Sequence, residues 1–98
     1  MLTKSYSPTG RSCRVTFELP AELEIEAAAL CGEFNEWSTT SHPLKRRKGG
    51  SLSAEVALKP GASYRFRYLL DGERWENDEA ADGYEPNPFG GEDSVVSI

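Results

Sequence analysis

The residues of this sequence best suited to contact a ligand are aromatic. Trp37 ends the hexapeptide GEFNEW (residues 32–37), and Trp75 follows the turn dipeptide Asp71-Gly72. A third aromatic residue, Phe89, lies in a segment rich in proline and glycine (84–91). Two interpretations are open for each indole. A tryptophan can fill the core of a small domain, but a flat indole in a loop beside Asn, Arg and Asp side chains also suits the apolar face of a sugar ring.

Residues that could catalyse a reaction or hold a metal ion are not arranged for either task. The sequence has no Gly-x-Ser-x-Gly motif and no glycine-rich phosphate loop, and His42 has no Cys or Ser partner nearby in sequence. Two cysteines and one histidine are too few for a zinc site. A calcium loop starting at Asp78 fails at its last position, where Phe89 replaces the required glutamate. We therefore expect a protein that is not an enzyme and needs no cofactor or metal.

The charge pattern argues against a nucleic-acid partner, and the lack of a long apolar run argues against a membrane. Sixteen acidic residues outnumber eleven basic ones, and residues 71–98 hold nine acids and one base. The single basic run, residues 45–48, is interpreted as a solvated loop or strand end rather than a phosphate-binding patch. No apolar run approaches the ~20 residues of a membrane-spanning helix. The N-terminus lacks the apolar core of a signal peptide, so we expect a cytoplasmic protein.

The elements that must position these residues are strands. Apolar and polar residues alternate, with turn residues between the alternating segments, which predicts an all-β fold, an antiparallel β-sandwich. The expected strands are 13–19, 25–31, 52–58, 64–70 and 94–98, with one helical turn at 78–83. In 64–70, Arg65, Arg67 and Leu69 face away from the core. The expected core residues are Val15, Phe17, Leu30, Val56, Phe66, Tyr68 and Val95.

The two cysteines are expected to be free. Alternation places Cys13 on the apolar face of its strand, whereas Ala28 and Leu30 face inward in the next strand and turn Cys31 outward. Residues directly opposite each other in an antiparallel pair share a face, so these cysteines should not form a cross-strand disulfide. We expect two reduced thiols, of which Cys31 is the accessible one.

Three ordered motifs resemble the family-48 carbohydrate-binding modules. They are GEFNEW, then KPGASYRFRYLLDGERW, then PNPFGGEDSVV, and the similarity spans residues 12–98 as one domain after an N-terminal extension, 1–11. This family includes the early-set domains of isoamylases and glycogen branching enzymes, and the glycogen-binding domain of the AMP-activated kinase β subunit. The chain looks most like the small stand-alone bacterial members, which have no catalytic barrel.

The resemblance implies an immunoglobulin-like early-set β-sandwich that binds α-glucans such as glycogen, starch or malto-oligosaccharides. By similarity, Trp37 and Trp75 flank the glucan chain, and Arg67 donates hydrogen bonds to sugar hydroxyls. Phe89 matches an apolar residue that packs on the sugar, and Asp93 stands where the kinase-type members have an amide. Asn35 is a further expected polar contact. The chain departs from the kinase type at Gly91, which replaces a threonine, and by one extra residue between Gly72 and Trp75.

Two other functions remain open at this point. One is a protein-interaction or regulatory module without sugar binding, which would dock a partner through the same aromatics or through its acidic face. The other is an accessory domain of an α-glucan-active family-13 enzyme, although the initial Met1 and the complete final strand favour an intact chain. An α-glucan-metabolising enzyme is thus a second expected partner, besides the glucan itself.

Overall fold

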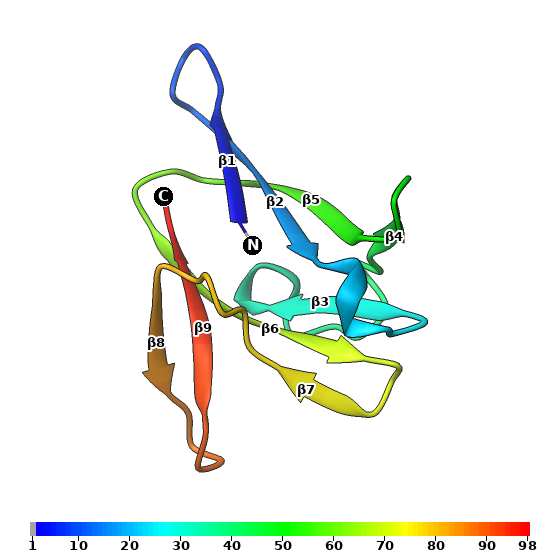
Figure 1. Cartoon of the computed structure of the whole chain (residues 1–98). Coiled ribbons are helices and arrows are strands. Elements are labelled where there is room, and N and C mark those ends of the chain that lie inside the picture. The colour runs from blue at the N-terminus through cyan, green and yellow to red at the C-terminus, as the bar shows by residue number, and fades with distance from the viewer. Residues whose placement is uncertain (1) are drawn as a thin grey trace.

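A computed structural model describes residues 2–98 as two antiparallel sheets (Figure 1). The first sheet has the order β1-β2-β5-β4, built from Leu2–Tyr6, Cys13–Leu19, Leu52–Leu58 and Lys45–Arg46. The second has the order β3-β6-β9-β8, built from Ala28–Gly32, Ser63–Leu70, Glu92–Ser97 and Gly83–Pro86, and β7 (Arg74–Glu76) also pairs with β6. Two single-turn 3₁₀ helices are η1 (Ala21–Leu23) and η2 (Glu33–Asn35). The predicted all-β sandwich is confirmed.

The strands predicted at 13–19 and 52–58 coincide with β2 and β5. The helical turn expected at 78–83 is wrong, because the segment is a turn that leads into β8. Asp78 explains the difference: its Oδ1 accepts a hydrogen bond from the Ala80 N–H at 2.7 Å. A short acidic side chain that bonds the backbone two residues on favours a turn over a helix.

The core lies between the sheets, and one expected member is misplaced. Six of the seven predicted residues belong to the main hydrophobic cluster, but Val95 is buried outside it and Val96 takes its place. The pairing of β6 with β9 decides this, since Tyr64 lies opposite Val96 and Phe66 opposite Ser94. Residues paired in this way share a face, so Val96 joins the inward row of β6 and Val95 faces the other side.

Both cysteines are free and both are fully buried, so the expected exposure of Cys31 is wrong. They lie in different sheets, on β2 and β3. Cys31 does face away from the core, as predicted, because it pairs with the outward residue Arg67 across the β3–β6 ladder. At Cys31 this outer face is covered by other parts of the protein, so the thiol is not exposed to solvent. Burial also raises the pKa of the Cys31 thiol.

The first residues, expected to be an extension, form strand β1 at the edge of the first sheet. Lys4 joins this strand to the other sheet: its Nζ donates to Asp82 Oδ2 at 2.7 Å and to the Ser97 carbonyl at 2.8 Å. Asp82 Oδ2 also accepts from the Ser97 N–H at 2.8 Å. Residues 2–6 are therefore part of the sandwich, while Met1 lies outside the described residues.

The outer edge of β3 is covered by residues 42–44, which run beside it. Leu30 N–H donates to the His42 carbonyl at 2.9 Å, and Leu44 N–H donates to the Ala28 carbonyl at 2.8 Å, on either side of a bridge at Pro43. The chain then enters β4, the two-residue strand at which the basic run 45–48 begins. Within residues 2–98, no helix is long and apolar enough to cross a membrane.

Candidate functional site

A cavity of about 510 Å³ lies on the outer face of the second sheet. Its lining residues come from η2 and the loop after it, from β6, β7 and β9, and from the turn between β8 and β9. They are Glu33, Trp37, Arg65, Arg67, Trp75, Asn87, Pro88, Phe89 and Asp93. Five of the six site residues expected from the sequence therefore line one cavity, and the sixth, Asn35, does not.

Both indoles belong to this cavity rather than to the core. Trp37 is 36% exposed and Trp75 is 40% exposed, and neither is part of the hydrophobic cluster. Trp75 lies opposite the outward residue Leu69 on β6 and so extends the outer face of the sheet. The interpretation of the tryptophans as core residues is excluded by this placement.

The loop that carries Trp37 holds an uncommon backbone conformation. Glu36 and Trp37 have φ of 56° and 58°, in the left-handed region that bulky residues rarely adopt. The Trp37 N–H donates to the Gly32 carbonyl at 2.8 Å, which closes the loop. A left-handed residue of this kind costs of order 1–3 kcal/mol, and such residues cluster at ligand sites. Other contacts must therefore keep the loop in place.

Asn35 supplies those contacts, which corrects its expected role as a sugar contact. Its Oδ1 accepts a hydrogen bond from the Gly32 N–H at 3.0 Å, and its Nδ2 donates to the Leu30 carbonyl at 2.9 Å. Nδ2 also lies 2.9 Å from Nδ1 of His42. Both the oxygen and the nitrogen of the Asn35 amide are thus bonded within the protein, and Asn35 stabilises the loop of Trp37 without lining the cavity.

Arg67 faces outward on β6, as predicted, and the structure places it beside Trp75. Its guanidinium carbon is 5.8 Å from the centre of the Trp75 ring, within the range of a cation–π contact. Its Nε is buried and has no hydrogen-bond partner among residues 2–98. A buried donor without a partner costs about 1–3 kcal/mol. The side chain is thus held against the indole, with hydrogen-bonding capacity that the protein leaves unused.

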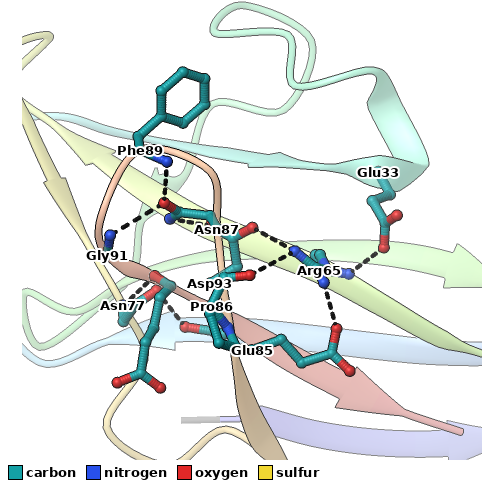
Figure 2. A network of polar contacts seen from close by, with 11 residues as sticks. Glu33, Arg65, Asn77, Glu85, Pro86, Asn87, Phe89, Gly91 and Asp93 are labelled. Atoms are coloured by element: carbon teal, nitrogen blue, oxygen red, sulfur yellow. Dashed lines mark hydrogen bonds and ion pairs between the residues drawn. The ribbon is translucent and has the colours of Figure 1, made fainter.

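Asp93 and Arg65, which both line the cavity, form a polar network (Figure 2). Arg65 Nη1 lies 3.5 Å from Asp93 Oδ2 and donates to the Pro86 carbonyl at 3.3 Å, while Nη2 lies 2.7 Å from Glu85 Oε2. The Arg65 N–H donates to Glu33 Oε1 at 2.7 Å. Asp93 is only 6% exposed. Its carboxylate is therefore engaged by the protein, not left open for a ligand as the resemblance implied.

The turn that carries Phe89 is organised by Asn87, which the sequence analysis did not single out. Asn87 Oδ1 accepts hydrogen bonds from the Phe89 N–H at 3.0 Å and the Gly91 N–H at 3.2 Å. Its Nδ2 donates to Asp93 Oδ1 at 3.1 Å. Phe89 itself is 92% exposed. The Asn-Pro-x-Gly order of residues 87–90 is a turn signal that could have indicated this role.

A second cavity, of about 400 Å³, lies near η1 and β7. Its apolar lining includes Leu19, Leu70 and Leu23, and the Leu23 side chain is 44% exposed. Its charged lining residues are Glu18, Arg74, Glu76, Asp78 and Glu79. Arg74 lies 3.5 Å from Glu76, so the surroundings of this cavity are acidic. In the described part of the chain, no three His, Cys, Asp or Glu side chains are grouped to hold a metal ion.

Comparison with known proteins identifies the family. The sequence profile of carbohydrate-binding module 48, described as the isoamylase N-terminal domain, matches residues 5–85. The matched segment includes Trp37, Arg67 and Trp75, and ends before Phe89 and Asp93. No curated protein matches the chain significantly. Because the profile covers most of the sequence, and the fold is the expected β-sandwich, this chain belongs to the carbohydrate-binding module 48 family.

Proposed function

We propose that this domain binds α-glucan chains, such as glycogen and malto-oligosaccharides, between Trp37 and Trp75. The observation that carries the proposal is the placement of two half-exposed indoles in one cavity outside the core. Apolar faces of glucose rings stack on indoles, and the third aromatic residue, Phe89, lines the same cavity. The Arg67 guanidinium also lines this cavity, and its N–H groups are donors from which sugar hydroxyls can accept hydrogen bonds.

The expected affinity is modest. A stacked indole whose face becomes covered contributes on the order of 2–3 kcal/mol at ~25 cal/mol per Å². An open site of this kind should bind a short malto-oligosaccharide with a Kd of roughly 10 µM to 1 mM. A glucan polymer offers many equivalent sites, so several copies of such a domain can bind along one chain even when each site is weak.

The proposed role is binding without catalysis. Glycosidases use two carboxyl groups on either side of the scissile bond, one as acid and one as base or nucleophile. The two carboxylates that line this cavity serve the protein instead: Glu33 accepts from the Arg65 N–H, and Asp93 is held by Arg65 and Asn87. We further propose that an α-glucan-metabolising enzyme in the cytoplasm is a partner, and that this enzyme performs any cleavage of the glucan.

Titration with maltoheptaose tests the proposal, with the Kd and melting temperature measured on the same variants. Trp37→Ala and Trp75→Ala should each weaken binding by about 30- to 100-fold, from the loss of about 2–3 kcal/mol of stacking. The matched control is Tyr6→Ala, which removes an exposed aromatic ring from edge strand β1, away from the cavity. Affinity unchanged in folded tryptophan variants would refute the proposal, as would the absence of any binding by the unaltered protein.

A protein-interaction module is the second candidate, and the acidic surroundings of the second cavity favour it. A cavity lined by both leucines and glutamates suits a segment that places one apolar side chain between lysines or arginines. A synthetic peptide of alternating leucine and lysine is a suitable probe. Under this function its NMR titration should shift the Leu23 and Ala80 signals, and Glu79→Gln should weaken the effect. No shift at either residue would exclude this candidate.

A further inference from the structure

The segment 87–91 carries the most exposed aromatic residue of the protein, yet its backbone is tied down. Asn87 is the centre of this arrangement, because its Oδ1 accepts from both the Phe89 and the Gly91 N–H groups. The Asn87 N–H donates to the Gly91 carbonyl at 2.8 Å, which closes the turn. Figure 2 shows Phe89 projecting from this turn, on the side away from Asp93. The Phe89 ring is exposed to solvent, but the backbone of its turn is fixed by hydrogen bonds to Asn87.

The same asparagine links the turn to the sheet. Its Nδ2 donates to Asp93 Oδ1 on β9, and the other oxygen of Asp93 faces the guanidinium of Arg65 on β6. Arg65 in turn donates to the carbonyl of Pro86, the last residue before the turn. The start of the turn is therefore anchored to β6 and β9 through three side chains, with Asp93 almost fully buried between the other two, and the end of the turn at Gly91 is hydrogen-bonded to Asn87.

We propose that Arg65 and Asn87 are positioning residues for ligand binding. Through Asp93, they hold segment 87–91 so that Phe89 lines the cavity of Trp37 and Trp75, called here the tryptophan cavity, before any ligand binds. This inference rests on the proposed glucan binding. A turn that is already ordered loses little conformational freedom on binding, whereas each segment or side chain that must be immobilised weakens the affinity. Asn87 and Arg65 thus raise affinity through Phe89 rather than through contacts of their own.

The test is a double-mutant cycle between positions 87 and 89, titrated with maltoheptaose. Asn87→Ala should weaken binding about 3- to 10-fold when Phe89 is present, which is the cost of ordering one or two groups on binding. In the Phe89→Ala background the same substitution should change the Kd by less than about twofold, because the group it positions is gone. An equal loss in both backgrounds would mean that Asn87 contacts the ligand or supports the whole fold, and would overturn the proposal.

A second readout requires no ligand. Asn87→Ala should speed the hydrogen exchange of the Phe89 and Gly91 amides while amides of β6 keep their protection. Asn77→Ala is the matched control: Asn77 Nδ2 is likewise bonded to the start of β9, at the Glu92 carbonyl, but Asn77 lies outside the tryptophan cavity. This variant should leave the exchange at residues 89 and 91 and the glucan affinity unchanged.

The two hypotheses fail in different ways. If the unaltered protein binds no glucan, the proposed function is refuted, and amide exchange alone decides whether Asn87 orders the turn. If the protein binds glucan but the amides of residues 89 and 91 exchange equally fast with and without the Asn87 side chain, positioning is refuted while the binding function stands. Arg65→Met should act in the same direction as Asn87→Ala on both readouts; a folded Arg65 variant with normal affinity would remove Arg65 from the proposal.

Discussion

Replacement of Gly32 by alanine should destabilise the domain, because strand β3 passes very close to β6 at this point. A Cβ atom on residue 32 would lie 2.6 Å from the Arg65 carbonyl oxygen and 2.9 Å from the Phe34 ring, where ordinary contacts are 3.4–4 Å. The Phe34 ring can turn aside, but the carbonyl belongs to the backbone of β6, next to Phe66, which pairs with Gly32. The strands must therefore separate by several tenths of an ångström or more, or the ladder must break.

The expected loss of stability follows from this geometry. Added volume in a well-packed site costs typically about 1–3 kcal/mol, and a backbone obstacle places Gly32→Ala toward the upper end. The lower entropy of an unfolded chain with alanine returns about 0.4–1 kcal/mol. The net loss is about 2 kcal/mol, which for a domain of this size lowers the melting temperature by about 8–16 °C.

Thermal unfolding followed by circular dichroism measures this shift, and Gly83→Ala is the matched control. Gly83 also lies in a strand, β8, but a Cβ there would have no atom within 4 Å and its φ is outside the left-handed region. Because no clash opposes the entropy gain of about 0.4–1 kcal/mol, its melting temperature should be equal to or up to about 8 °C above that of the unaltered protein. If both variants melt together, the close approach of β3 and β6 is not the reason for glycine at position 32.

Three further outcomes are expected. Cys13 and Cys31 should both resist iodoacetamide in the folded protein and react after unfolding in urea, because both are buried and burial raises the pKa of Cys31; labelling of either in the native state would contradict this. Partial burial raises the pKa of Asp82, but hydrogen bonds from Lys4 and the Ser97 N–H outweigh it and lower the pKa below 3.8. The stabilisation by Asp82 is thus present above about pH 4 and is lost as the pH falls through the folded-state pKa. In Asp82→Asn, the free energy of unfolding should therefore depend less steeply on pH below about pH 4. An unchanged slope in urea titrations would refute the contact. Arg67→Ala should weaken maltoheptaose binding by about 5- to 30-fold in calorimetry, the equivalent of 1–2 kcal/mol, with tighter binding as the contrary result.

The aromatic residues of the candidate site could be predicted from the sequence because the relevant signals are local. Trp37 and Trp75 follow a strand and a turn that are visible in the residue order, and alternation along β6 is enough to place Arg67 on the outer face. The same alternation correctly places Arg65, two residues earlier, on the outer face. It does not show that Asp93 and Pro86 are the partners of Arg65, because both are more than 20 residues away in the sequence.

The corrections at Cys31 and Asn35 share one cause, which is that periodicity gives the direction of a side chain but not what lies against it. Cys31 faces outward and is buried all the same. Asn35 lies in the loop that leads to Trp37, but its partners are the Leu30 carbonyl and His42, and His42 reaches it only because residues 42–44 run beside β3. The adjacent valines of β9 are a different case. Either Val95 or Val96 could face the core, and only the pairing of β9 with β6 shows that it is Val96.

The segment beside β3 has a further consequence, for the behaviour of the protein at high concentration. A free strand edge is a template for pairing with another molecule, which leads to aggregation. Here residues 42–44 occupy the outer edge of β3, and Pro43 at the centre of that segment has no N–H to offer a neighbouring chain. In the other sheet, the edge strand β4 is only two residues long and both are cationic. Growth of fibrils by strand addition at β3 would therefore first require residues 42–44 to detach, so substitutions that loosen this segment should promote aggregation even where the sandwich itself stays folded.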